Sequence, residues 1–223
     1  MKINYNEEYK KVVSNLKNSD KPSIFLHACC GPCLTYPLTE LIKHFRVTVG
    51  YINPNIYPRE EHEKRYDELK RFIDELNETL DEKVKVVKYD YDYQVYLNAV
   101  KGHEMDKEGG ERCTICHELR LNEAYEYASK NNYDYFTSVM TVSSKKPSSL
   151  LNEIGFELQS KYPNTKYLPA DFKKCNGTLK GINIGKEHHL YRQDYCGCSF
   201  SKREREEYRE KKVNSKSSQN NID

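Results

Sequence analysis

The sequence predicts an α/β fold in which a parallel sheet carries helices on both faces. Short apolar runs alternate with longer segments of helical periodicity along the 223 residues. We expect strands at 23–28, 47–52, 84–87, 135–140 and 166–170. Strands that alternate with helices are typical of parallel sheets, because each parallel connection needs a crossover that a helix supplies. The length is enough for one domain with a well-buried core.

The helices are expected between these runs. We predict them at 33–44, 58–80, 92–100, 113–130 and 148–162. The second is the clearest, since Leu69, Phe72, Ile73 and Leu76 recur at helical spacing and would face the core. Pro58 suits its first turn, where a missing N–H costs nothing.

The last part of the chain is strongly polar. Charges of both signs alternate over 202–212, which is typical of an exposed helix with ion pairs along its surface. We expect a single α/β domain over residues 1–213, followed by a polar disordered tail over residues 214–223.

Composition narrows the class of protein. The formal net charge is only +2, which is weak evidence for a nucleic-acid partner. No apolar run approaches the roughly 18–20 residues that a membrane span needs, and the N-terminus lacks the apolar core of a signal peptide. We therefore expect a cytoplasmic protein without a membrane partner. In a reducing compartment, cysteines are more often metal ligands or redox-active thiols than disulfides.

Seven of the eight cysteines form three tight groups that are far apart in sequence. The groups are Cys29, Cys30 and Cys33, then Cys113 and Cys116, then Cys196 and Cys198. Two C-x-x-C pairs suit a four-cysteine zinc site or a 4Fe–4S cluster, although a dithiol redox pair shares that spacing. Seven thiols exceed what one tetrahedral metal ion needs. The first group follows the strand at 23–28, where open α/β sheets form their sites.

Other candidate residues are interpreted more simply. Cys175 stands alone, and we leave it out of the site. We interpret His27 as a hydrogen-bonded core histidine and His117 as structural or solvent-facing. Lys145 and Lys146 could hold a phosphate group, but a solvated turn is the default interpretation. Neither a dinucleotide fingerprint nor a P-loop is present.

Three sequence motifs together suggest a family. They are His-x-Cys-Cys-Gly-Pro-Cys from His27, Arg-Cys-x-x-Cys-x-x-x-Arg-Leu from Arg112, and Tyr-Arg-Gln-x-Tyr-Cys-Gly-Cys from Tyr191. In this order and spacing they resemble the cobalamin-independent epoxyqueuosine reductases. The resemblance spans about residues 20–201 and includes the segments 53–58 and 170–174.

The resemblance implies a Rossmann-like parallel sheet flanked by helices, of the adenine-nucleotide hydrolase-like kind, in one catalytic domain. It implies reductive deoxygenation of epoxyqueuosine to queuosine in the wobble position of tRNA. The implied cofactors are a 4Fe–4S cluster and one additional iron ion. The implied partners are tRNA carrying epoxyqueuosine and a one-electron donor such as a ferredoxin or flavodoxin.

We assign the seven thiols between the two centres as a hypothesis. The cluster is expected on four of them, Cys30, Cys33, Cys113 and Cys116. The second iron, which would bind the epoxide oxygen, is expected on the other three, Cys29, Cys196 and Cys198. Asp194 and Tyr195 are candidate proton donors because they adjoin Cys196. No substrate-binding residue is assigned.

Two other classes remain open from the residues alone. One is a zinc-binding nucleic-acid-binding module, which would be colourless and hold stoichiometric zinc. The other is a thiol redox enzyme, which would contain a low-pKa cysteine and keep its activity without metal.

Overall fold

The computed structural model describes residues 3–16 and 21–219. Its centre is a five-stranded sheet in the order β3-β2-β1-β4-β5, and all neighbouring strands are parallel. The strands are β1 (Ser23–Ala28), β2 (Arg46–Tyr51), β3 (Lys85–Lys88), β4 (Tyr135–Ser138) and β5 (Lys166–Tyr167). The predicted fold class is confirmed.

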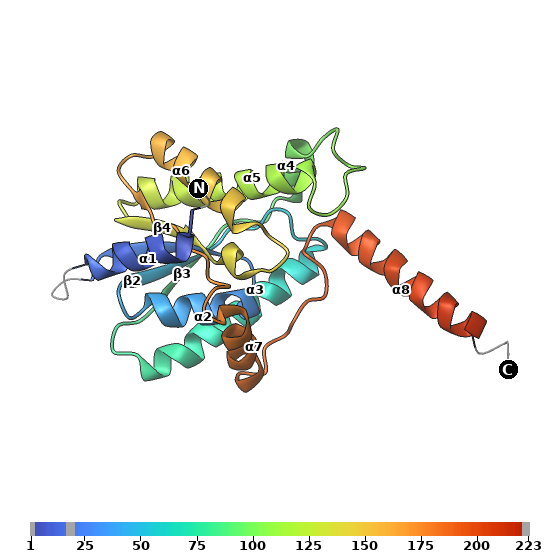
Figure 1. Cartoon of the computed structure of the whole chain (residues 1–223), viewed down its shortest axis with the longest axis horizontal. Coiled ribbons are helices and arrows are strands. Elements are labelled where there is room, and N and C mark those ends of the chain that lie inside the picture. Colours follow the sequence, from blue (N-terminus) through green and yellow to red (C-terminus); the bar gives the residue numbers. More distant parts are fainter. Residues whose placement is uncertain (1–2, 17–20, 220–223) are drawn as a thin grey trace.

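Helices cover the sheet on both faces (Figure 1). They are α1 (Tyr5–Ser14), α2 (Gly31–Leu41), α3 (Arg59–Thr79), α4 (Tyr93–Ala99), α5 (Glu111–Lys130), α6 (Ser148–Lys161), α7 (Gly177–Glu187) and α8 (Ser199–Gln219), with a short 3-10 helix, η1 (Val139–Val142). No helix in the described part of the chain is both long and apolar enough to cross a membrane.

Alternate side chains of β1 supply the two hydrophobic cores. Ile24 and Leu26 face the core formed with α2 and α3, and Phe25 faces the core formed with α5 and α6. All three are fully buried. Because β1 lies in the middle of the sheet, its carboxyl end is held between both helix layers. That end carries the first cysteine group.

Two helices were not predicted, and two strands are shorter than predicted. The helix α1 was assigned no structure, and α7 lacks a clear apolar stripe. α7 packs closely through Gly177, where a Cβ would meet the Phe172 carbonyl oxygen at 1.8 Å and Tyr36 at 2.6 Å. β4 stops at Ser138, whose hydroxyl accepts a hydrogen bond from Met140 N and starts η1. The strand β5 ends at Tyr167, and the last backbone hydrogen bond from the predicted strand at 166–170 to β4 runs from Leu168 N to Phe136 O at 2.8 Å.

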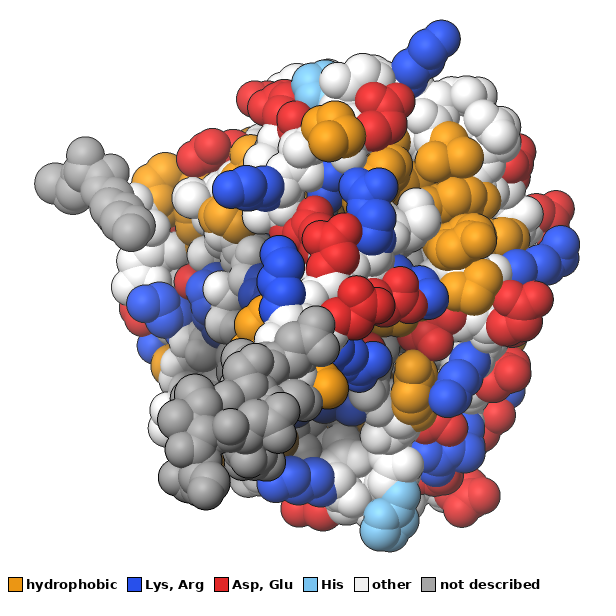
Figure 2. Space-filling model, turned by 90° about the vertical axis from the view of Figure 1, so that its right-hand side faces the viewer, with side chains coloured by type: hydrophobic (Ala, Val, Ile, Leu, Met, Phe, Trp, Pro, Cys, Tyr) orange, Lys and Arg blue, Asp and Glu red, His pale blue; other side chains and the backbone are white. Residues whose placement is uncertain are grey.

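The helix α8 projects from the body of the molecule (Figure 1). Seen from that side, basic and acidic side chains lie next to one another around it (Figure 2). Lys202 pairs with Glu206, and Arg203 lies 4.0 Å from Glu207, so the expected ion-paired helix is confirmed. Within the predicted tail, α8 continues to Gln219, and residues 220–223 lie outside the described residues.

Candidate metal centre

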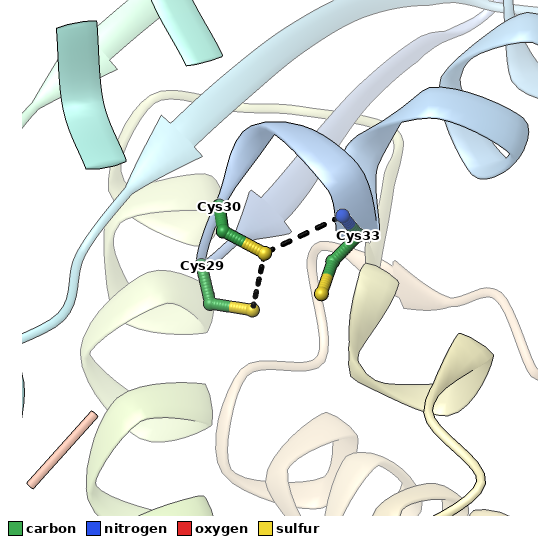
Figure 3. A group of neighbouring side chains, drawn as sticks. All are labelled: Cys29, Cys30 and Cys33. Carbon is green, nitrogen blue, oxygen red and sulfur yellow. Dashed lines mark hydrogen bonds between the residues drawn. The ribbon is translucent and has the colours of Figure 1, made fainter. Parts of the chain in front are cut away.

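The first cysteine group forms a compact thiol triad at the carboxyl end of β1 (Figure 3). The Sγ atoms of Cys29, Cys30 and Cys33 all lie within 4.8 Å of one another. Cys30 is the N-cap of α2, and its Sγ accepts a hydrogen bond from Cys33 N at 3.4 Å. The positive end of a helix dipole favours a thiolate at this position.

Within the triad, the thiol of Cys29 is the one that ionises most readily. Burial raises the pKa of the Cys30 thiol to about 12. Hydrogen bonds from the Cys30 and Cys33 thiols hold the pKa of Cys29 well below its ordinary value, and the cations of Arg120 and Lys146 add to that effect. The triad is therefore prepared to present an anionic sulfur, which is the form that binds metal.

The second and third groups together hold four more thiols, called here the four-thiol group; among the described residues, only the triad has three ligand sulfurs within 4.8 Å of one another. Cys113 and Cys116 lie in the first turns of α5, and Cys196 and Cys198 lie just before α8. Burial raises the pKa of Cys113, and it raises that of Cys116 to about 12. The charges of Cys196 and Cys198 raise both values further.

Backbone N–H groups point at two of these sulfurs. Gly109 N donates to Cys113 Sγ at 3.2 Å, and Ser201 N donates to Cys198 Sγ at 3.4 Å. Hydrogen bonds of this kind stabilise thiolates and tune the potentials of thiolate-bound clusters.

Arg120 on α5 connects all three groups. It is 2% exposed, and it donates to Asn53 Oδ1 at 2.7 Å, while its Nε has no partner. Burial alone would lower the pKa of this guanidinium, but Cys116, Cys29 and Cys196 raise it above its ordinary value. These three sulfurs come one from each group. The groups that are far apart in sequence therefore converge on one buried cation.

The buried charge of Arg120 is evidence that these residues suit a metal centre. Among the described residues, no carboxylate pairs with Arg120. An uncompensated buried charge costs about 3–5 kcal/mol. The Cys29 thiol, whose pKa is held low, is a compensating group at hand, and ionised thiols are metal ligands. The donor set therefore fits thiolate-bound metal.

A cleft of about 680 Å³ opens onto these thiols. Cys29, Cys33 and Cys196 line it, together with Lys146. The charges of Cys196, Cys29 and Cys33 raise the pKa of the Lys146 ammonium group, so it stays a cation there. The Lys145 side chain is 73% exposed, as the interpretation of this turn as solvated expects, whereas Lys146 is half-buried and lines the cleft.

A family model described as Epoxyqueuosine reductase QueH matches residues 24–204, which is most of the chain. The chain belongs to this family. QueH proteins are oxidoreductases, so the chain is an enzyme. Membership favours the reductase over the zinc module and the thiol redox enzyme that the residues alone left open.

Curated QueH relatives match nearly the whole chain. The chain is 37% identical over 203 residues to epoxyqueuosine reductase QueH of Staphylococcus epidermidis, covering 90% of this chain and 85% of that one. It is 38% identical over 201 residues to the enzyme of Streptococcus pyogenes, covering 90% and 78%. It is 30% identical over 186 residues to the enzyme of Thermotoga maritima, covering 83% and 93%.

A solved structure shares the fold. It is the U34-tRNA thiolase NcsA from Methanococcus maripaludis with its [4Fe-4S] cluster, with a TM-score of 0.50 and 16% identity. The likeness covers 88% of this chain and 69% of that one. The parallel sheet flanked by helices that the motifs led us to expect is thus shared with this structure.

In this QueH chain, Arg65 on α3 fixes the loop that carries the third cysteine group. Its NH1 donates to Cys196 O at 2.9 Å, and its NH2 donates to Tyr195 O at 3.3 Å. Gly197 has a φ of 151°, and a Cβ there would meet Asn55 Nδ2 at 3.2 Å and Arg65 NH1 at 3.3 Å. Only glycine suits this backbone and this space.

The two candidate proton donors make other bonds. The Asp194 carboxylate pairs with Arg209 and, at 3.3 Å, with Arg205 on α8. The Tyr195 hydroxyl donates to Tyr57 O at 2.6 Å. Both residues line the cleft, but their acidic groups are engaged in holding α8 and the loop. Their catalytic role stays a prediction.

The structure also shows the surroundings of two histidines and of the lone cysteine. His27 is fully buried and bonds to Ser138 Oγ at 2.9 Å and Ile52 O at 3.2 Å, which confirms a core histidine. His117 is buried, its Nδ1 has no partner, and burial with the Lys146 charge lowers its pKa to about 3. Cys175 is exposed and is not among the grouped thiols.

Sequence reasoning missed Arg120, Lys146 and Gln193 as site residues. Gln193 Nε2 donates to Cys30 Sγ at 3.0 Å. A signal existed for Arg120, because Cys113, Cys116 and Arg120 share one face of a helix at i, i+3 and i+7. Nothing local to the sequence marks Lys146, since only the folded chain brings its loop to the thiols.

Proposed function

We propose that this QueH enzyme reduces epoxyqueuosine to queuosine in the wobble position of tRNA, with a 4Fe–4S cluster and a single iron on its seven grouped thiols. The observation that carries the proposal is the thiol triad at the carboxyl end of β1, whose Sγ atoms lie within 4.8 Å of one another, and of which Cys29 and Cys33 line the same cleft as Cys196 of the third group. The name of the relatives and the U34-tRNA thiolase with its cluster support it. A tRNA substrate agrees with a cytoplasmic site of action.

The reaction must balance electrons and protons. Both epoxide C–O bonds break, a C=C bond forms, and the oxygen leaves as water after taking two electrons and two protons. A one-electron donor such as a ferredoxin or flavodoxin would deliver the electrons in two steps. Metal bound to these thiols would supply one-electron transfer and a Lewis acid for the epoxide oxygen.

The thiols themselves support one division between the two centres. The division expected from the sequence separates Cys29 from Cys30 and Cys33, although these three sulfurs lie within 4.8 Å of one another. We propose instead that the thiol triad holds the single iron and that the four-thiol group holds the cluster. Three thiolates leave an iron with an open position, and Cys29 and Cys33 face the cleft.

The protein contributes charge and shape at the bottom of the cleft. Arg120 and Lys146 offset the negative charge of the thiolates. Gln193 holds Cys30 Sγ by a hydrogen bond. The Lys146 ammonium lines the same cleft as Cys29 and Cys196, so a negatively polarised oxygen bound there would meet a fixed cation.

The test is anaerobic reconstitution with iron and sulfide, followed by metal analysis, Mössbauer spectroscopy and assay on tRNA that contains epoxyqueuosine. We expect about five iron and four sulfide per chain, in two kinds of iron site. Mass spectrometry of tRNA nucleosides should show queuosine replacing epoxyqueuosine.

Cys175→Ser is the matched control, because it removes the one cysteine outside the three groups and should keep full metal content and activity. A wild-type protein that binds one zinc and no sulfide would refute the proposal. A strain without the chain should accumulate epoxyqueuosine in its tRNA.

A further inference from the structure

Segments from several parts of the chain line the cleft beside the thiols. They are the first cysteine group with Cys29, Pro32 and Cys33, residues 142–146, α7 and the segment that follows it to Cys196, together with Glu108. A cavity of about 680 Å³ is in the range of small-molecule sites, which run from about 300 to 1,000 Å³.

Part of the cleft lining is apolar and partly bare. Pro32, Val142, Ile182 and Leu190 line it. α7 contributes two glycines to the same lining, and a Cβ at Gly185 would meet nothing within 4 Å. A flat ring can therefore lie directly against this part of the helix.

Two exposed cations also line the cleft. Lys186 and Arg192 are exposed, and within the described ranges neither pairs with a carboxylate. The two acidic lining residues are engaged, since Glu108 lies 3.9 Å from Lys145 and Asp194 pairs with Arg205 on α8. The whole chain has a net charge of only +2, so this positive charge is a local feature.

We propose that this cleft receives a single nucleotide extruded from an RNA loop, with its base against α7 at Gly185 and its flanking phosphates on Lys186 and Arg192. The inference rests on the proposed function and names the residues that bind its substrate. An apolar slot suits a nucleobase, and exposed cations beyond it suit the chain on either side.

Aliphatic side chains and helix backbone make the base contacts in this arrangement. The one tyrosine in the lining, Tyr195, is already committed, since its hydroxyl bonds to Tyr57 O and Arg65 lies 5.1 Å from its ring centre.

The first experiment places a side chain in the apolar part of the cleft, where we propose that the base binds. Gly185→Leu adds a side chain into open space on the lining and favours helix, so the chain should fold and bind metal as the wild type does. We expect turnover of tRNA containing epoxyqueuosine to fall at least about 100-fold, with metal content and circular dichroism unchanged. Asn183→Leu, which adds the same side chain at an exposed position of α7 outside the lining, should stay active.

The second experiment measures RNA binding without turnover, using an unmodified anticodon stem-loop as the probe. Lys186→Ala and Arg192→Ala should each lower the slope of log Kd against log salt by about 0.7 to 0.9. Lys180→Ala is the control, since it removes the same charge from α7 outside the cleft lining. It should leave the slope unchanged.

The outcomes separate this inference from the proposed function. Full activity of Gly185→Leu, or unchanged salt slopes in both Lys186→Ala and Arg192→Ala, would overturn the inference while the reductase remains. An enzyme that fails to reduce epoxyqueuosine, but whose RNA binding responds to these two substitutions, would keep the inference and remove the proposed function.

Discussion

The Arg120 guanidinium and the Asn53 side-chain amide are joined by a buried hydrogen bond of 2.7 Å. The other end of the Asn53 amide donates to Ala28 O at 2.9 Å, directly before the thiol triad. Asn53 follows β2, and Ala28 is the last residue of β1. The Arg120 side chain of α5 is therefore attached, through Asn53, to the ends of both strands. The position of Arg120 relative to the sulfurs is therefore fixed by the sheet.

Replacing this cation should change the electronic properties of bound metal. Arg120→Met removes a buried positive charge beside sulfurs of all three groups, so an added electron is less stabilised. We expect the midpoint potential to fall by about 60 mV, which is about 1.4 kcal/mol for one electron. An anaerobic redox titration followed by EPR measures it. Arg203→Met, at an exposed position of α8, is the control, and an equal potential in both variants would contradict the expectation.

The two divisions of the thiols predict different losses of metal. If the triad holds the single iron, Cys30→Ser should lose that iron and keep the cluster spectrum. Cys113→Ser should damage the cluster and spare the single iron. The division expected from the sequence predicts that both variants lose the cluster. Mössbauer spectra of the two reconstituted variants decide between them.

Gly197 should tolerate no side chain. Gly197→Ala places a Cβ against Asn55 and Arg65 at a positive φ, so we expect a loss of about 1–3 kcal/mol in the free energy of unfolding and lower metal content. Urea unfolding measures the first and iron analysis the second. Gly102→Ala is the matched control, because its φ is also positive, at 89°, while a Cβ there meets nothing within 4 Å. Equal losses in the two variants would show that contacts at Gly197 are unimportant.

Buried neutral histidines should make the protein less stable in mild acid. Burial lowers the pKa of His62 below its ordinary value of 6.5, so below that pH the unfolded chain binds a proton that the folded chain resists. This stabilisation is complete above the unfolded pKa and is lost as the pH falls, by up to about 1.4 kcal/mol per pH unit. His62→Phe keeps a ring against Tyr91 and should flatten the dependence between pH 7.5 and 5.5 in urea unfolding. An unchanged slope would contradict it.

Asp194 can be tested as a proton donor against its observed ion pairs. A general acid contributes about 10²–10⁴-fold to a rate. Because the Asp194 carboxylate pairs with Arg205 and Arg209, we expect Asp194→Asn to lower kcat only a few-fold and to loosen α8. Single-turnover rates measure the first, and hydrogen exchange of α8 measures the second. A loss of 100-fold or more with α8 unaffected would support the catalytic assignment instead.

The fold was predictable where one element shows its own periodicity. The helix α3 has an apolar stripe that includes Leu69 and Phe72, and β1 is a short apolar run, so both were found close to their observed bounds. α7 was missed because it packs by bringing Gly177 against Phe172 and Tyr36, and close backbone approach leaves no apolar pattern. Local patterns record burial of large side chains better than they record close packing.

The site was predictable as a set of thiols but not as an arrangement. Spacing identified the seven cysteines, since C-x-x-C and C-x-C are local features. Their grouping depends on how β1, α5 and the approach to α8 meet in space, which no local pattern contains. Lys146 shows the same limit, because an adjacent pair of lysines looks solvated until the fold turns one of them toward Cys196.

The order of the cysteine groups along the chain has a consequence for biosynthesis. The triad follows the first strand of the sheet, while Cys196 and Cys198 directly precede the last helix. A nascent chain on the ribosome can fold the triad early, but it lacks the complete set of sulfurs until Cys198 has been translated. Loading of both centres is thereby deferred until the third cysteine group has been made, and a translation product truncated before that group would present only part of the donor set to cellular iron.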